Sequence, residues 1–265
     1  MKEIVFPALG LNLKINSIAI TIGSIDIYWY AICIVLAFAI GCLLCKKDDG
    51  KYNIKYEDIL ELFIFVIPVS IICARLYFVI FNLKDYINNP IEILNIRNGG
   101  LAIYGGIIGA VITIFIYCKI KKMKILDVLD YIAPYLPLGQ AIGRWGNFFN
   151  AEAHGIETTS FFRMGLIENG RYIEVHPTFL YESIACFCIF IILYILKNKR
   201  KYKGQITYTY LALYGLIRAF IEGLRTDSLM IGNFRISQVL STILFVGFGS
   251  IIIIKNIKKD YENEK

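Results

Sequence analysis

The stretch ILDVLDYIAPYLPLGQAIGRWGNFFNAEAHG occupies residues 125–155 and joins two unlike parts. The first part is apolar, although Pro134, Pro137 and Gly139 interrupt it. A helix broken at membrane depth is tolerated only where protein or a water-filled cavity surrounds it. The second part, 143–155, holds an arginine, two asparagines, a glutamate and three glycines. Polar groups beside a bilayer are costly unless they are paired or in use, so we expect a functional site here.

The whole chain is unusually apolar. It is 57% hydrophobic and 18% charged, with a mean hydropathy of +0.60, which is outside the range of soluble globular proteins. Segments near the length of a membrane-spanning helix lie at 17–45, 58–83, 101–118, 125–143, 177–196, 205–224 and 236–254. We therefore expect an all-α polytopic membrane protein with seven transmembrane helices. No linker-like stretch divides the chain, so residues 1–265 should form a single integral membrane domain.

The basic residues set an orientation. They cluster after the first, third, fifth and seventh segments, at 46–55, 119–124, 197–203 and 255–265. By the positive-inside rule the N-terminus is outside and the C-terminus is cytoplasmic. Residues 144–176 then form an extracytoplasmic loop between spans four and five. The unusual polar residues of the spans gather at that outer face: Arg75, Arg144, Glu182, Arg218 and Glu222.

Several other classes of protein are disfavoured. The net charge of +7 lies in the clusters between apolar segments, which indicates topology and attraction to anionic lipid, not nucleic-acid binding. The seven cysteines lack zinc-site spacing and are expected to be buried filler. No cofactor or metal is expected. Residues 1–17 carry Lys2 and Lys14 and lack the compact apolar core of a removable signal peptide.

The sixth segment carries a polar helix face. Tyr214, Arg218, Glu222 and Arg225 recur at intervals of four, four and three residues. An interhelical ion pair between Arg218 and Glu222 would explain this face in purely structural terms. With Arg144 predicted at the same depth, positive charge is in excess. A phosphate ligand then becomes the better explanation, since guanidinium groups suit bidentate contacts to phosphate oxygens.

The run 143–155 also resembles the signature G-R-x-G-N-F-x-N-x-E-x-x-G of the bacterial prolipoprotein diacylglyceryl transferases. Further motifs similar to this family occur in order along nearly the whole chain. They are Tyr28-Trp29-Tyr30, Ala74-Arg75-Leu76-Tyr77, the glycine-rich run from Asn98 to Gly106, His176-Pro177-Thr178 with Leu180-Tyr181-Glu182, and the polar face of the sixth segment.

The resemblance implies a specific reaction. The family moves the diacylglyceryl group of phosphatidylglycerol to the lipobox cysteine of a preprolipoprotein signal peptide, forming a thioether and releasing glycerol phosphate. This is the first step of bacterial lipoprotein maturation. It implies a multi-pass enzyme of the bacterial cytoplasmic membrane, whose partners are these two substrates and membrane lipid.

The same resemblance suggests roles for individual residues. Arg144 and Arg218 are expected to stabilise the phosphate and the leaving group. Asn147 should position the headgroup, and Glu152 should orient an arginine. The glycines Gly143, Gly146 and Gly155 are expected to allow close backbone approach or positive φ. The full set of expected substrate-binding residues is Tyr30, Asn147, Asn150, Glu152, Gly155, Tyr214, Glu222 and Arg225.

The departure from the family is Tyr104, where many members carry histidine as a candidate base. An unperturbed phenol is a poor base at neutral pH, so Tyr104 is instead expected to donate a hydrogen bond to phosphate or thiolate. His176 precedes a proline at a helix start, where a structural capping role competes with a catalytic one. His154 stays ambiguous, and a thiol partly ionised at pH 7 needs no dedicated base.

Other functions remain open on the residues alone. A secondary transporter also uses broken helices and buried charge, but its site should lie at the midplane and repeats should be visible. A structural subunit would not need so many polar groups in 143–155. Another headgroup enzyme shares the phosphate logic and commonly needs clustered aspartates for magnesium. The segment 151–175 is either a small head over the site or a solvated cap.

Overall fold

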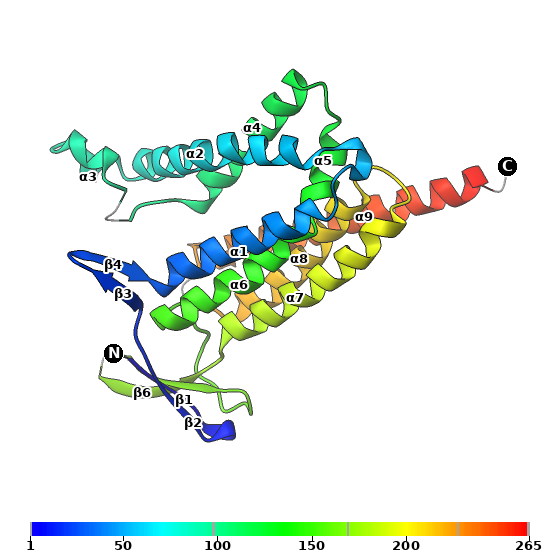
Figure 1. Cartoon of the computed structure of the whole chain (residues 1–265). Coiled ribbons are helices and arrows are strands. Elements are labelled where there is room, and N and C mark those ends of the chain that lie inside the picture. The colour runs from blue at the N-terminus through cyan, green and yellow to red at the C-terminus, as the bar shows by residue number, and fades with distance from the viewer. Residues whose placement is uncertain (1, 97–98, 169, 227, 264–265) are drawn as a thin grey trace. The chain divides into compact units, whose positions relative to one another are not determined.

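The structure is a computed structural model that describes residues 2–96, 99–168, 170–226 and 228–263 (Figure 1). Asn98 of the glycine-rich motif lies outside these residues. The chain divides into two compact units, which are described separately: Met1–Cys45 with Ile132–Lys265, and Lys46–Tyr131. Both are mostly helical.

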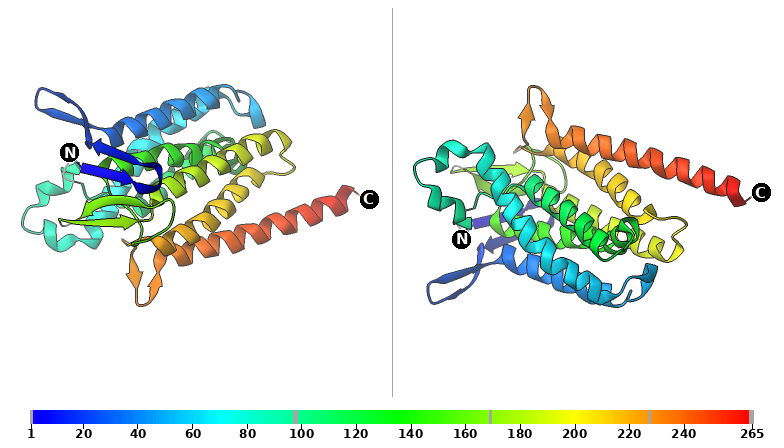
Figure 2. Two further views of the ribbon diagram at one scale, coloured as in Figure 1. Left: turned by 90° about the horizontal axis from the view of Figure 1, so that it is seen from below. Right: turned by 90° about the horizontal axis from the view of Figure 1, so that it is seen from above.

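The larger unit is a bundle of long helices. These are α1 (Trp29–Lys46), α6 (Tyr135–Asn150), α7 (Thr178–Leu196), α8 (Gln205–Leu224) and α9 (Ile236–Asn263). Neighbours pack in chain order, α6 on α7, α7 on α8 and α8 on α9. Figure 2 shows α8 and α9 side by side. Their close approach depends on Gly215, because a Cβ there would lie 2.7 Å from the carbonyl oxygen of Ser241.

The expectation of an all-α fold was wrong. Four strands, β1 (Lys2–Phe6), β2 (Leu11–Ile15), β5 (Met164–Glu168) and β6 (Arg171–Val175), form an antiparallel sheet in the order β2-β1-β5-β6. Residues 11–15 alternate apolar and polar side chains, which is the period of a half-buried strand. Gly10 and Gly170, with φ of 61° and 78°, stand at the two hairpin turns, where a left-handed conformation favours glycine.

The first expected span, 17–45, also begins later than predicted. Its first third is a hairpin of β3 (Ile18–Ile22) and β4 (Ile25–Tyr28), and the helix starts only at Trp29. β-Branched isoleucine at nearly every second position favours a strand, and Gly23 with φ of 61° permits the turn. A third hairpin, β7 (Met230–Ile231) with β8 (Phe234–Arg235), precedes α9.

The four-stranded sheet is fixed to the ends of α6 and α7. One apolar core combines Ile4 and Ile15 of the first hairpin with Met164, Leu166 and Val175 of the second, and with Phe148 of α6 and Phe179 of α7. Lys2 Nζ also donates to the carbonyl oxygen of Asn150 at 2.6 Å, at the C-terminus of α6. The segment 151–175 is therefore part of a small folded head, as one of the two expectations held.

The second unit contains α2 (Tyr56–Phe81), α3 (Leu83–Tyr86), α4 (Ile103–Ile120) and the start of α5 (Ile125–Ile132). The predicted interruption of the fourth segment is confirmed, since α5 ends at Ile132 and α6 begins at Tyr135 after Pro134. Pro137 and Gly139 do not interrupt the helix, since α6 continues through both. Pro137 lies in the first turn of α6, where a missing N–H breaks no helical bond.

The helices support a multi-pass membrane protein. Within the described residues, five helices are long and apolar enough to cross a membrane: Trp29–Lys46, Tyr56–Phe81, Ile103–Ile120, Thr178–Lys199 and Ile236–Lys259. Isoleucine, leucine and phenylalanine side chains remain exposed along these helices, which suits a lipid environment better than water.

Glycines set the packing of α2 against α4. A Cβ at Gly105 would collide with the backbone of Cys73, and one at Gly109 would lie 2.8 Å from the Cβ of Cys73. Absence of side chains at these positions lets the helix backbones approach closely, as in other membrane bundles.

The substitution Gly105→Ala should therefore destabilise the second unit by about 1–3 kcal/mol, because the added methyl group forces α2 and α4 apart. Gly247→Ala on α9 is the matched control, since no heavy atom lies within 4 Å of the Cβ position there. Thermal unfolding in detergent should show a lower Tm for the first variant and an equal or higher Tm for the second. Equal Tm values for both would contradict the packing assigned to Gly105.

Candidate active site

A buried carboxylate organises the polar residues of the larger unit. Glu182, one turn into α7, is only 1% exposed. It accepts hydrogen bonds from Arg144 Nη2 on α6 at 2.6 Å, and from Arg218 Nη1 and the Tyr214 hydroxyl on α8 at 2.9 and 3.2 Å. Three helices thus meet at one side chain. From the sequence, Glu182 was expected to be one of the unusual polar residues at the outer face, but it was not one of the candidate site residues.

A second carboxylate completes the charge balance. Glu222 is 2% exposed and lies one turn after Arg218 on α8, with 2.7 Å between Arg218 Nη2 and Glu222 Oε2, although the two atoms are not aligned as a hydrogen bond. The pair considered from the sequence is therefore intrahelical, and the interhelical pairs are those that Glu182 makes. The expected excess of positive charge was also wrong for Arg144 and Arg218, since two carboxylates face them.

The geometry nevertheless presents the cations outward. The side chains of Arg144 and Arg218 are 22% and 17% exposed, whereas the two carboxylates behind them are almost fully covered. A guanidinium group has five N–H donors. Only two of those on Arg144 are used in hydrogen bonds to described residues, one to Glu182 and one to Asn147. The cluster can therefore offer oriented donors to an anionic ligand.

The polar run after Arg144 forms a hydrogen-bonded relay. Arg144 Nη1 donates to Asn147 Oδ1 at 3.2 Å, and Asn147 Nδ2 donates to Glu152 Oε1 at 3.0 Å. Asn150 Nδ2 donates to the same oxygen of Glu152 at 3.0 Å. Glu152 therefore reaches the arginine only through Asn147. Arg144 and Asn147 lie on the last two turns of α6, because the helix continues to Asn150 and the loop begins at Ala151.

The turn after α6 holds two alanines in a conformation that favours glycine. Ala151 and Ala153 have φ of 47° and 56°, a left-handed conformation that costs a non-glycine residue of order 1–3 kcal/mol. This turn places the Glu152 carboxylate within hydrogen-bond distance of the side-chain amides of Asn147 and Asn150. None of Gly143, Gly146 and Gly155 has such a φ, so of the two expected reasons for these glycines, close backbone approach or positive φ, only close approach can apply.

Close approach does explain two of the three glycines. A Cβ at Gly146 would collide with the ring of Tyr30 on α1, which places Tyr30 against the same helix as Arg144. A Cβ at Gly155 would lie 2.8 Å from the Cβ of His176 and 3.0 Å from the carbonyl oxygen of Leu224. At Gly143 no heavy atom lies within 4 Å, so neither expected reason applies there.

Gly155 ties the loop to the end of α8. Its backbone forms a β-bridge with Arg225, and Ile156 N donates to the carbonyl oxygen of Leu224 at 2.8 Å. Arg225 is the C-cap of α8 in an extended conformation, so it leaves the helical face that its spacing predicted. The carbonyl oxygen of His176 accepts from Gly155 N at 2.9 Å.

The two histidines have local partners. The Nδ1 atom of His176 lies 3.2 Å from the Tyr181 hydroxyl, and the residue does not cap α7, whose N-cap is Pro177. The Nε2 atom of His154 lies 3.5 Å from Glu168. Neither contact leads to Glu182 or its arginines.

Tyr104 and Arg75 belong to the second unit. Tyr104 stands in the first turn of α4. Arg75 is 6% exposed and donates to five backbone carbonyl oxygens, those of Glu92, Ile93, Asn95, Gly99 and Gly100. All of its donors are used on the segment that leads into α4, so Arg75 has a structural role.

Glu182→Gln should destabilise the larger unit, because Arg144 and Arg218 would lose a buried counter-charge, a loss that typically costs 3–5 kcal/mol. Glu168→Gln provides the matched control, since its carboxylate is about half exposed and contacts only His154 among the described residues. The measurement is Tm in detergent together with the fraction of protein that remains monodisperse. A Glu182→Gln variant as stable as the control would show that this carboxylate does not organise the three helices.

The chain is similar to known proteins over most of its length. The family model described as prolipoprotein diacylglyceryl transferase matches residues 17–254. A phosphatidylglycerol–prolipoprotein diacylglyceryl transferase of Clostridium novyi is 49% identical over 251 residues, covering 92% of this chain and 97% of that protein. Proteins of the same name from Clostridioides difficile and Listeria monocytogenes are 46% and 47% identical, covering 94% and 92% of this chain and 98% and 91% of their own. The chain therefore belongs to the prolipoprotein diacylglyceryl transferase family.

Proposed function

We propose that this chain transfers the diacylglyceryl group of phosphatidylglycerol to the thiol of the lipobox cysteine in a prolipoprotein, the first step of lipoprotein maturation. In this reaction the cysteine sulfur attacks the glycerol carbon that bears the phosphate. A C–S bond forms, the C–O bond to phosphate breaks, and glycerol phosphate departs with the electron pair. The thiol proton passes to solvent or to the departing phosphate.

One observation carries the proposal beyond family membership. Arg144 and Arg218 come from different helices and are held on the same buried carboxylate, with their guanidinium groups on the more exposed side. Negative charge grows on the phosphate as the C–O bond breaks. Donors that are already oriented toward that charge stabilise the transition state without reorganising, and removal of one such donor typically costs 10²–10³ in rate.

The other candidate residues have supporting roles in this proposal. Asn147 positions both Arg144 and the lipid headgroup, and Glu152 holds Asn147 and Asn150 in place. Tyr214 helps to fix Glu182, Glu222 orients Arg218, and Tyr30 and the Gly155–Arg225 bridge border the site. Tyr104 donates a hydrogen bond to phosphate or thiolate. A cysteine thiol with a pKa of about 8.5 is already a few per cent ionised at pH 7, so no dedicated base is required.

The membrane topology is part of the proposal. We place seven spans in one integral membrane domain of residues 1–265, in the bacterial cytoplasmic membrane, with the N-terminus outside and the C-terminus in the cytoplasm. Segments α5–α6 and α8 supply the two spans beyond the five most apolar helices. These two differ from the five because α6 has only 16 residues and α8 carries charged residues, among them Arg218 and Glu222. Region 144–176 then faces outward, and both substrates enter laterally from the bilayer.

Arg144→Ala should lower kcat about 100- to 1,000-fold, since it removes a donor to the leaving phosphate. The assay uses purified protein in detergent with phosphatidylglycerol and a fluorescent lipobox peptide, and follows the peptide mass and released glycerol phosphate together. Arg171→Ala is the control, because its side chain is largely exposed in the head. Full activity of Arg144→Ala at normal protein level would refute the phosphate role, and no product from the wild-type protein would refute the proposed reaction.

Activity should also be unchanged by a chelator. Among the described residues no group of three or more His, Cys, Asp or Glu side chains could hold a metal ion, and the arginines would supply the charge that magnesium supplies in other headgroup enzymes. Initial rates measured with and without excess EDTA test this expectation. A loss of activity that magnesium restores would favour a metal-dependent headgroup enzyme instead.

A further inference from the structure

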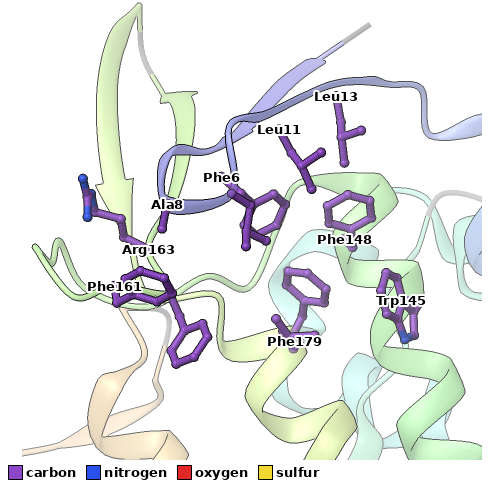
Figure 3. Close-up of a pocket in the computed structure, with 12 residues that line it drawn as sticks. Phe6, Ala8, Leu11, Leu13, Trp145, Phe148, Phe161, Arg163 and Phe179 are labelled. Atoms are coloured by element: carbon purple, nitrogen blue, oxygen red, sulfur yellow. The ribbon is translucent and has the colours of Figure 1, made fainter.

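An apolar pocket of about 250 Å³ lies between the head and the ends of α6 and α7 (Figure 3). Leu11 and Leu13 of β2 form one wall, and Phe161 and Phe162 of the loop before β5 form another. Trp145 and Phe179 close it toward the helices, as Figure 3 shows. All of these residues belong to the larger unit. The proposed phosphate cluster does not use this pocket.

Two residues that line the pocket are close in the chain to members of that cluster. Trp145 follows Arg144 directly on α6, and Phe179 precedes Glu182 by one turn on α7. The rings of Trp145 and Phe179 pack edge to face, with centroids 5.7 Å apart. A molecule seated in the pocket therefore contacts residues that lie within one helical turn of Arg144 and Glu182.

The position of the pocket disfavours a lipid acyl chain as its occupant. The acyl chains of a phospholipid run from the headgroup into the bilayer, alongside the membrane helices. The outer wall of the pocket is built instead from strands and loops beyond the C-terminus of α6 and the N-terminus of α7 (Figure 1). In the proposed topology, an acyl chain would have to turn back from the bilayer to enter the pocket, whereas a peptide that leaves the membrane would pass through this region.

The wall at β2 suits an extended peptide. β2 is an edge strand in the order β2-β1-β5-β6, and among the described residues it pairs only with β1. Leu11 and Leu13 are two residues apart, so both point to one face of the strand. A peptide that pairs along this edge would place its own alternate side chains on that same face, which is the face of the pocket.

The side chains around the mouth are unusually exposed for their type. Phe161 and Phe162 are 64% and 61% exposed, and Leu11 is 46% exposed. They make up a contiguous apolar rim on a small sheet domain, a feature that marks an interaction site more often than a free surface. Among the described residues, those that line the pocket include no carboxylate, and their one cation, Arg163, is paired with Glu174.

We propose that this pocket binds the apolar, extended segment of the prolipoprotein that flanks the acceptor cysteine, and so presents the thiol to the Arg144–Arg218 cluster. The inference rests on the proposed function for the identity of the substrate. It assigns to the head the recognition of the protein substrate and leaves recognition of the lipid to the helices.

The test is the double variant Phe161→Ala/Phe162→Ala in the full-length protein. Loss of two rings that would be covered by the peptide should raise KM for the prolipoprotein about 10-fold or more. KM for phosphatidylglycerol and kcat at saturation should stay within about two-fold of the wild-type values, because neither ring belongs to the cluster. Tm should be unchanged. Ile167→Ala is the matched control, since Ile167 of β5 is equally exposed, at 61%, and does not line the pocket.

A binding experiment separates this inference from the proposed reaction. A photo-crosslinking residue at position 161 is irradiated with a prolipoprotein that carries serine in place of the acceptor cysteine, in vesicles containing phosphatidylglycerol. An adduct with the prolipoprotein supports the pocket, even if the wild-type protein shows no transfer. An adduct with phospholipid, or no adduct and an unchanged KM in an enzyme that does transfer, overturns the pocket and leaves the reaction standing.

Discussion

The larger unit depends on one ionised group held inside an apolar bundle. Glu182 is almost completely covered, and such a carboxylate is tolerable only when cations and hydroxyl groups satisfy it. Arg144 from α6 and Arg218 and Tyr214 from α8 do so. Because these partners come from both neighbouring helices, the requirement to satisfy one side chain also fixes the relative register of α6, α7 and α8.

The same requirement fixes the direction of the arginine N–H donors. An arginine that is anchored at one end of its guanidinium group cannot turn freely, so its remaining donors keep a fixed direction. A chain of hydrogen bonds from Arg144 Nη1 through Asn147 to Glu152 holds the same guanidinium group at its other terminal nitrogen. In the proposed mechanism, structure and catalysis therefore use the same contacts, so an ion pair and a phosphate site need not be alternatives.

The head adds a separate surface next to this cluster. Its sheet is attached through Phe148 and Phe179 to the two helices that carry Arg144 and Glu182. The apolar pocket beside Trp145 lies at that attachment. A protein substrate and a lipid substrate can then approach one site from two sides. That separation suits a reaction in which the acceptor is a chain leaving the membrane and the donor stays within it.

The sequence alone indicated the membrane character, the break at Pro134 and the presence of charged residues in apolar segments, among them Arg144, Arg218 and Glu222. Apolar length and the position of a charge along the chain are local properties that need no tertiary contact. The sequence missed the sheet, since β1 and β5 are more than 150 residues apart and short strands carry a weak pattern. It did not predict the left-handed conformation of Ala151 and Ala153. Only the tertiary structure showed that Glu182 binds both arginines. Charge pairing between helices depends on which faces meet, and periodicity along one segment does not contain that information.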